Sequence, residues 1–272
     1  NAVTVREASD AGQRSVEHLG GILEGCSAIE DEVRHQVDPP IKDGEFSEFP
    51  RRIAARGERL LTTYDASKAQ ELFARLAENR TWQVPTLVVQ YTWTFIDDLS
   101  QAPDPRMKYI PLSEAEWWGP KKNFLFRYRT AEFIAFRKKI FPKQLELVGA
   151  MHRAGVPFMA GTDVSYPYSF PGFSLHDELA LFVQAGFTPM EALQSATVNP
   201  AKFLGVSEKL GTVERGKIAD LVLLDANPLA DIKNTRRVDA VVVNGRYLSN
   251  AELRKMLAGV EAAAAAKVEK PD

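Results

Sequence analysis

The sequence predicts an α/β fold followed by a small β module, and two observations support this prediction. Up to Gly205, short apolar runs alternate with longer segments of helical periodicity, a pattern typical of a mainly parallel sheet or barrel. After Gly205, short runs rich in Val and Leu are separated by turn dipeptides instead. We therefore expect an α/β unit over residues 1–205, the β module over 206–249, and a final helix and tail over 250–272.

The first third of the chain is predicted to be mainly helical. Thr4 and Glu7 have capping-box spacing, and Asp65 is a suitable N-cap for a later helix. Pro39 and Pro40 should end the helix before them, because proline cannot continue a helical hydrogen-bond ladder. Helices are expected over residues 4–12, 22–37, 49–61 and 65–79, and strands over 14–17 and 82–90.

Residues 94–124 lack regular periodicity and combine prolines with aromatic side chains. A long aromatic loop in a compact domain is often a lid or a binding loop, which makes Trp117 and Trp118 candidate substrate contacts. An equally good interpretation is a surface excursion that is held in place by its own aromatic side chains. The sequence leaves both interpretations open.

In the rest of the α/β unit, predicted helices and strands alternate again, and the β module follows. A long amphipathic helix is expected over 127–154, with an interruption near Pro142. Thr188-Pro189 and Asn199-Pro200 each predict a helix start, and Asn250 is the expected cap of the last helix. A further helix is expected over 174–185, and strands over 156–160, 211–213, 219–224 and 240–243.

The most informative segment ends at Asp163, where the apolar run from Val156 stops at Gly-Thr-Asp. In an α/β protein the carboxyl end of a buried strand faces the crevice that holds ligands. Asp163 is therefore the first candidate for catalysis, and a structural acid in a loop is the alternative. His18 follows the first predicted strand and should lie at the same edge of the sheet. This pair suits zinc or a similar divalent ion, although a catalytic zinc usually has three protein ligands.

The other histidines and the standard motifs add less. His176 falls in the first turn of the helix after Asp163, so it is either a substrate contact or a solvated side chain. His35 and His152 lie within amphipathic segments and are best explained as surface groups. The sequence contains no G-x-S-x-G elbow, no Walker phosphate loop and no H-E-x-x-H helix.

Composition excludes several classes of function. The formal net charge is −2 with acids and bases interleaved, so neither nucleic acid nor a membrane is an expected partner. No apolar run approaches the ~18 residues that a membrane span needs. The single cysteine, Cys26, excludes an intrachain disulfide and a cysteine-cluster metal site. The compartment stays unknown.

Six segments in the last 113 residues form a joint pattern. They are Ala160–Asp163, Leu175–Leu179, Glu191–Thr197, Asn199–Ala201, Leu210–Leu221 and Val243–Gly245. Together they resemble the carboxyl-terminal half of the metal-dependent amidohydrolase superfamily, in particular its imidazolonepropionase-like and prolidase-like branch. Upstream, Ser15–His18 resembles the family's sixth barrel strand. The resemblance implies a partial (β/α)8 TIM-type barrel, about strands six to eight, with part of a small β-sandwich.

The same resemblance implies a hydrolase that cleaves amide or other C–N bonds of a small amide or dipeptide. Water would be activated by one or two divalent metal ions, zinc above all. His18 and Asp163 would be metal ligands, and Asp163 would also carry a proton from the water to the leaving nitrogen. His176, Trp117 and Trp118 would lie near the substrate.

One departure from the family pattern is large. The His-x-His pair of the first barrel strand is absent, and the strand-four lysine and strand-five histidine would also precede Asn1. We therefore expect an incomplete piece of an enzyme that is inactive alone. The alternative is a non-catalytic remnant or a binding module. In a standalone remnant, the open barrel edges would have to pair with a second copy of the chain or with a separate amino-terminal half.

Overall fold

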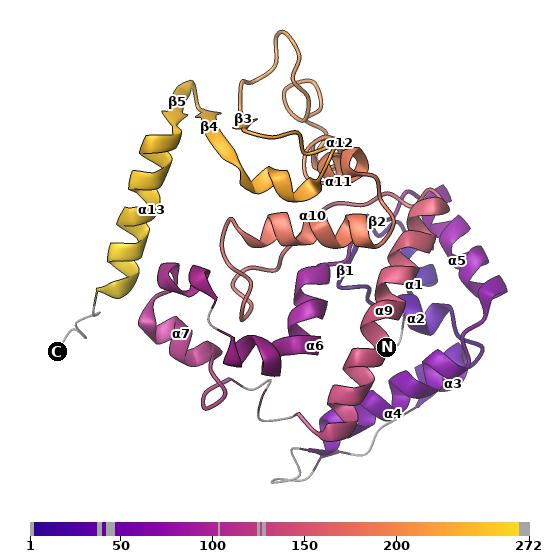
Figure 1. Cartoon of the computed structure of the whole chain (residues 1–272). Helices are drawn as coiled ribbons and strands as arrows, with labels where there is room; N and C mark the ends of the chain where they lie inside the picture. The colour runs from indigo at the N-terminus through magenta and orange to yellow at the C-terminus, as the bar shows by residue number, and fades with distance from the viewer. Residues whose placement is uncertain are drawn as a thin grey trace.

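The computed structural model describes residues 3–36, 40–41, 47–102, 104–123, 126 and 129–266, which form a mixed α/β fold (Figure 1). Predictions that involve Val37, Pro39, Pro103, Phe124 and Arg127 lie outside these residues. The first strands are β1 (Ser15–Glu17) and β2 (Trp82–Val84), and the later ones are β3 (Leu221–Leu224), β4 (Val238–Val243) and β5 (Arg246–Ser249). The helices of the first half are α1 (Val5–Asp10), α2 (Ile22–Gly25), α3 (Glu30–His35), α4 (Glu48–Thr62), α5 (Ala66–Glu78), α6 (Leu87–Gln101), η1 (Pro105–Tyr109) and α7 (Leu112–Trp118). Those of the second half are α9 (Ala131–Arg153), α10 (Ser174–Gln184), α11 (Pro189–Ser195), α12 (Val198–Phe203), η2 (Ile232–Arg236) and α13 (Asn250–Ala265).

A short parallel sheet brings distant parts of the chain together. β1 pairs with β2 in parallel, with Val16 opposite Gln83. The strand predicted over 156–160 is present only as a parallel bridge between Gln83 and Phe158. There the Gln83 N–H donates to the Pro157 carbonyl at 2.9 Å, and the Gln83 carbonyl accepts from the Met159 N–H at 3.0 Å. All three segments run in the same direction, so their carboxyl ends meet at one edge.

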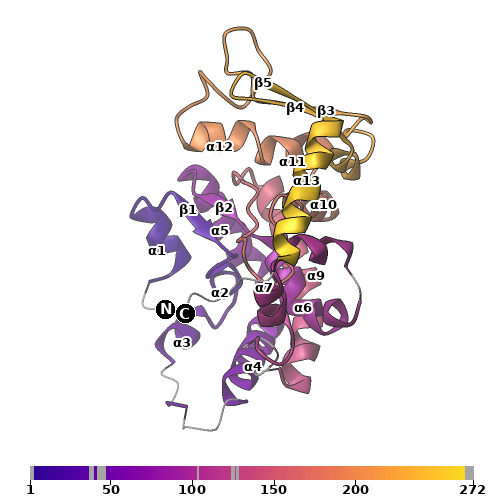
Figure 2. The ribbon, with the colours of Figure 1, turned by 90° about the vertical axis from the view of Figure 1, so that its left-hand side faces the viewer.

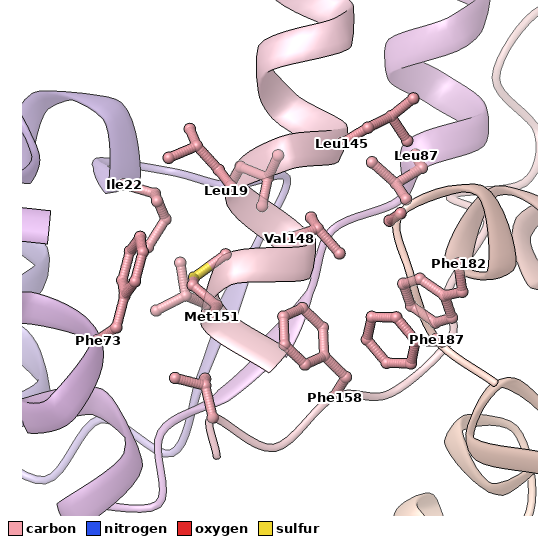
Figure 3. Close-up of a cluster of buried hydrophobic side chains, with 14 of the residues drawn as sticks. Leu19, Ile22, Phe73, Leu87, Leu145, Val148, Met151, Phe158, Phe182 and Phe187 are labelled. Atoms are coloured by element: carbon pink, nitrogen blue, oxygen red, sulfur yellow. The ribbon is translucent and has the colours of Figure 1, made fainter. Parts of the chain in front are cut away.

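The core lies between this sheet and the long helix α9 (Figure 3). Leu145, Val148 and Met151 project from α9 toward apolar side chains that include Phe158 and Phe182, all of them buried. Each such side chain contributes about 1.5–3 kcal/mol when it leaves water. The predicted interruption at Pro142 is wrong, since α9 continues through this exposed residue. The buried side chains on both sides of Pro142 hold the helix in one piece.

The helix predicted over 22–37 divides into α2 and α3. The intervening residues pair with the end of α4 instead, through an antiparallel bridge between Ser27 and Tyr64. The Asp65 N–H also donates to the Cys26 carbonyl at 2.8 Å. The backbone groups between α2 and α3 thus form hydrogen bonds with a distant segment, in place of the hydrogen bonds of a continuous helix.

The strand predicted over 82–90 ends early, because Leu87 begins α6. The buried Glu178 carboxylate accepts hydrogen bonds from the backbone N–H groups of Leu87 at 2.9 Å and Val88 at 2.7 Å. These bonds satisfy groups that have no partner at a helix start. The prediction is wrong beyond β2 because a run that is buried on all sides has the same apolar composition in a helix as in a strand.

The irregular loop predicted over 94–124 is also wrong, because much of it is helical. It contains the end of α6, η1 and α7. Pro105 occupies the first turn of η1 and Pro111 precedes α7, so these prolines mark helix starts rather than a loop. Trp118 is 1% exposed and packs with Ile110 and Phe170.

The β module is an antiparallel sheet in the order β3-β4-β5. β5 is an addition to the predicted strands, whereas the strand expected over 211–213 is absent and Val213 is 84% exposed. Figure 2 shows this sheet lying over α11 and α12. α12 starts at Val198, ahead of the predicted Asn199, and Ser249 rather than Asn250 caps α13 through a capping box with Glu252.

α13 leaves the β module and reaches η1, where Lys108 pairs with Glu261 at 2.8 Å. Figure 1 shows this helix standing apart from the sheet that carries the core. Within the described part of the chain, none of the helices combines the length and the apolar character that a bilayer span requires.

Candidate functional site

Three polar residues follow the three parallel segments at their shared edge, and all have left-handed backbone conformation. The φ angles are 58° at His18, 45° at Thr86 and 47° at Asp163. A residue with a Cβ in this region costs on the order of 1–3 kcal/mol and persists where the surrounding structure holds it. Backbone strain of this kind clusters at functional sites. Two of the three strained residues, His18 and Asp163, are the candidates predicted from the sequence.

The structure fixes the orientation of the His18 ring. The His18 N–H extends the strand pairing by donating to the Val84 carbonyl at 3.0 Å. Its Nδ1 lies 2.7 Å from the Thr86 hydroxyl, which is also 2.8 Å from the Pro85 carbonyl. When the hydroxyl donates to Pro85, it accepts from the ring at Nδ1, and this tautomer leaves Nε2 with its lone pair.

The free nitrogen of His18 faces the carboxylate of Asp163. His18 Nε2 and Asp163 Oδ2 are 4.0 Å apart, and their side chains are 48% and 49% exposed. Zinc binds nitrogen and oxygen ligands at about 2.0–2.2 Å, which places two ligands of one tetrahedral ion roughly 3.4 Å apart. A shift of about 0.6 Å would let both atoms bind the same ion. These two donors fit part of a metal site.

The rest of such a site is missing from the described residues. Among residues 3–36, 40–41, 47–102, 104–123, 126 and 129–266, no group of three or more His, Cys, Asp or Glu side chains is arranged to hold a metal. A catalytic zinc usually has three protein ligands and an open position. The two donors are therefore fewer than the three protein ligands that a catalytic zinc usually has.

A buried polar layer behind His18 was not predicted from the sequence. Gln90 Nε2 lies 3.5 Å from the His18 carbonyl, and Gln90 Oε1 accepts from Arg137 at 3.1 Å. The Tyr166 hydroxyl is buried and, within the described residues, lacks a hydrogen-bond partner, and burial raises the pKa of this phenol. The sequence signal for these residues is weak, since each one resembles an ordinary polar position in a helix or loop.

Glu178 is a second buried polar residue near the site that was not predicted from the sequence. Burial raises the pKa of its carboxyl to about 8, while hydrogen bonds from the N–H groups of Val88 and Leu87 oppose that shift. This carboxyl group caps α6 and so fixes the turn that contains Thr86. Glu178 thus acts on the site through the backbone.

The other predicted site residues lie elsewhere. The His176 ring contacts the Thr235 hydroxyl of η2 at 2.9 Å, and burial lowers its pKa. Trp118 is buried and donates from its indole nitrogen to Glu114 at 3.1 Å, whereas Trp117 is 41% exposed. The structure brings His18 and Asp163 together, and the substrate roles of His176, Trp117 and Trp118 stay predictions.

The fold and the His–Asp pair define an α/β protein with a site at the ends of its parallel strands. Comparison with known proteins identifies its family. The pattern of the amidohydrolase family matches residues 110–248, just over half of the chain. The chain belongs to the amidohydrolase family, which confirms the resemblance seen in the sequence.

Two relatives illustrate the similarity. The imidazolonepropionase of Pseudomonas savastanoi pv. phaseolicola (strain 1448A / Race 6) is 40% identical over 90 residues, which cover 33% of this chain and 22% of the relative. That of Thermoplasma volcanium is 39% identical over 82 residues, 29% of this chain and 19% of the relative. The matched region thus spans about a fifth of the length of either relative.

A solved structure supports the fold independently. The bottromycin amidohydrolase superposes with a TM-score of 0.63 over 97% of this chain and 52% of its own length, at 19% sequence identity. This similarity concerns the fold alone, because the identity is low. The fold similarity covers nearly the whole chain, and thus also the part before residue 110 that the family match does not reach.

Proposed function

We propose that this chain is part of a metal-dependent hydrolase that cleaves amide or other C–N bonds of small molecules. The observation that carries the proposal is the His18–Asp163 pair, 4.0 Å apart at the shared carboxyl edge of parallel segments. Family membership supports the class of bond that is cleaved, and the geometry of the pair supports the position of the site. The substrate class we propose is a small amide, a cyclic amide or a dipeptide.

The proposed fold is a piece of a (β/α)8 barrel. β1, β2 and the segment around Phe158 correspond to strands six, seven and eight, and β3 to β5 belong to a small β-sandwich. The proposed units are residues 1–205 for the barrel part, 206–249 for the sandwich part and 250–272 for the final helix and tail. The TM-score of 0.63 with an amidohydrolase supports this assignment.

A divalent ion, zinc in our proposal, would polarise the attacking water when bound. His18 would hold the ion through Nε2, because the other ring nitrogen is hydrogen-bonded to the Thr86 hydroxyl. Asp163 would hold the ion or the water, accept a proton at Oδ2 and return it to the leaving nitrogen. Its 49% exposed side chain leaves room for a substrate beside it.

Two donors from this chain leave the site incomplete, so we propose that further ligands come from a separate segment or from a second copy of the chain. Open edges of the parallel sheet are suitable for such pairing. On this proposal the chain of 272 residues does not hydrolyse amides by itself. The alternative is a non-catalytic remnant that keeps the fold without the chemistry.

The experiment is a hydrolysis screen of the natural gene product that contains this sequence, loaded with zinc, against dipeptides and cyclic amides. We expect turnover that falls at least about 1,000-fold in Asp163→Asn, because general acid–base groups contribute that order of rate. His35→Asn serves as the matched control, since among the described residues the His35 ring bonds only to a backbone carbonyl of its own helix. Wild-type turnover in Asp163→Asn would contradict the proposal, and a zinc-loaded protein without turnover would support the remnant.

A further inference from the structure

A cavity of about 730 Å³ lies at the amino ends of the parallel segments, between α12 and the starts of β1 and β2 (Figure 2). The His18–Asp163 pair lies at the opposite, carboxyl edge of these segments, and neither residue lines the cavity. The volume is typical of small-molecule pockets in proteins. An inference about this cavity therefore does not depend on the proposed hydrolysis.

Three cationic side chains line this cavity without an acidic partner. In the part of the chain that the structure describes, Arg14, Arg80 and Lys202 form no ion pair, and all three residues are exposed. Glu191 is the one acidic residue of the lining, and it pairs with His152 at 3.2 Å. The cavity thus keeps an excess of positive charge, which attracts anions.

Arg14 is held in the wall of the cavity by Phe203. Its guanidinium lies over the Phe203 ring, 4.4 Å from the ring centroid, and its Nη2 donates to the Phe203 carbonyl. The Trp82 ring meets the same phenyl ring edge-on, with 5.9 Å between the centroids. A guanidinium has five N–H donors, and among the described residues Arg14 donates only from Nη2. The group is thus oriented, and its other donors are available to a ligand.

Arg80 occupies a backbone position that disfavours arginine. It follows α5 with a φ of 52°, and its N–H and that of Thr81 donate to the carbonyls of Ala77 and Leu76 at 3.1 and 2.9 Å. These two bonds make a Schellman motif, in which glycine is the usual residue at this position. The residues of positive φ that follow α1, α9, α10 and α12 are all glycines, namely Gly12, Gly155, Gly186 and Gly205.

The exception at Arg80 needs a reason, because a side chain at this φ lowers the stability of the folded state. Strained residues of this kind cluster where a side chain serves binding or catalysis. Arg80 lines the cavity beside Arg14 and Lys202. A ligand that pairs with the Arg80 guanidinium accounts for an arginine where the other helix ends have glycine.

The charge and the walls of the cavity define the class of ligand. Three cations and one carboxylate leave an excess of two positive charges, which matches a phosphate monoester near neutral pH. Arginine recognises phosphate through paired hydrogen bonds. The rings of Trp82 and Phe203 provide an apolar surface beside these cations. We propose that the cavity binds a small phosphate monoester with an aromatic body, whose phosphate pairs with the three cations.

The experiment is calorimetric titration of the full chain with phenyl phosphate, and with phenol and inorganic phosphate as probes of its two parts. We expect saturable binding of phenyl phosphate with a Kd of about 1 mM or tighter. Phenol should bind at least about 10-fold more weakly, because it offers no charge to the cations. Inorganic phosphate should bind several-fold more weakly, because it has no ring to pack on the aromatic wall.

Two results of this titration would overturn the proposal. Equal affinities for phenyl phosphate and phenol, or no saturable binding of phenyl phosphate, would show that the cations do not form an anion site. Equal affinities for phenyl phosphate and inorganic phosphate would contradict the recognition of an aromatic body.

Variants of Arg14 and Lys202 locate the binding. Arg14→Met and Lys202→Met should each weaken the binding of phenyl phosphate at least about 10-fold. Arg153→Met is the matched control, because this exposed cation at the end of α9 follows His152 in the chain but does not line the cavity. Wild-type affinity in both of the first two variants, or an equal loss in the control, would contradict the assignment.

Arg80→Gly separates binding from stability. Glycine relieves the backbone strain, so the melting temperature should rise by about 1–4 °C. The binding of phenyl phosphate should nevertheless weaken at least about 10-fold, because a cation is lost from the cavity. A structural arginine would give the opposite pattern, a lower melting temperature with unchanged binding, and that result would overturn the role of Arg80.

Discussion

At the scale of single residues, the account depends on how Thr86 orients His18. The Thr86 hydroxyl is the only group of the described residues that contacts the ring at Nδ1, at 2.7 Å. Partners of this kind set the tautomer and the direction of a ligand histidine, and their removal typically lowers metal affinity about 10–100-fold. On the proposed function, Thr86 is therefore a positioning residue rather than a catalytic one.

Replacement of Thr86 tests this role. Thr86→Val keeps the shape of the side chain and removes the hydroxyl, so zinc affinity should fall about 10–100-fold. Thr86→Ser keeps the hydroxyl and should retain affinity close to that of the wild type. A competition titration with a zinc indicator measures both. Equal affinities for the Val and Ser variants would show that the hydrogen bond to His18 has no role in binding.

Glu178 predicts a pH dependence of stability. Because burial raises the pKa of its carboxyl from 4.5 to about 8, the folded state binds a proton more tightly than the unfolded state. The contribution of Glu178 to the free energy of unfolding is therefore fully present below pH 4.5 and is lost as the pH rises to about 8. The loss reaches at most ~1.4 kcal/mol per unit of pH.

Urea unfolding at several pH values measures this effect in the wild type and in Glu178→Gln. The glutamine variant does not titrate, so the difference between the two free energies of unfolding should change between about pH 5 and pH 8. At low pH the two proteins should be close in stability, because the neutral carboxyl of the wild type, like the amide, has one strong acceptor oxygen, and the wild type should lose stability relative to the variant as the pH rises toward 8. A difference that stays constant across this range would contradict the assigned pKa.

At the scale of elements, local signals were predictable and long-range pairings were not. The capping boxes at Thr4 and Thr188 involve residues three positions apart, so the sequence alone reveals them. The break between α2 and α3 depends on the bridge from Ser27 to Tyr64, which no local pattern encodes. The start of α6 depends on Glu178, a residue far along the chain.

The candidate site follows the same rule. His18 and Asp163 were predictable because the carboxyl ends of parallel strands meet at one edge, wherever the strands lie in the sequence. Arg137, Gln90 and Tyr166 were not, because the burial of a polar side chain is a property of the packed structure. The sequence thus predicts the edge of the sheet and misses the layer behind it.

The packing of α4 on α9 gives a prediction for Gly57. A Cβ at this position would lie 2.0 Å from the Phe136 ring, so the two helices approach each other only because the side chain is absent. Gly57→Ala should therefore destabilise the protein by about 1–3 kcal/mol, as over-packing does, although alanine favours helices.

Gly259 is the matched control for that substitution. It lies in α13, and no atom comes within 4 Å of the position that a Cβ would occupy there. Gly259→Ala should therefore stabilise the helix by about 0.5–1 kcal/mol. Thermal unfolding of both variants provides the comparison. A stabilised Gly57→Ala variant would mean that α4 and α9 are farther apart than the structure has them.

At the scale of the whole molecule, the chain combines a family fold with a site that we propose to be incomplete. The parallel sheet presents two donors at one edge, and the described residues contain no third ligand arranged beside them. The central claim is that His18 and Asp163 are real metal ligands that cannot form a catalytic site without further ligands.

The most direct test is a competition titration that measures zinc binding by this chain. The account predicts one zinc ion bound weakly, with a Kd of about 1 µM or weaker, and binding that is lost in the His18→Asn/Asp163→Asn double variant and unchanged in His35→Asn. Tight stoichiometric zinc in the purified chain would contradict the incompleteness of the site. Equal affinity in the wild type and the double variant would contradict the assignment of its ligands.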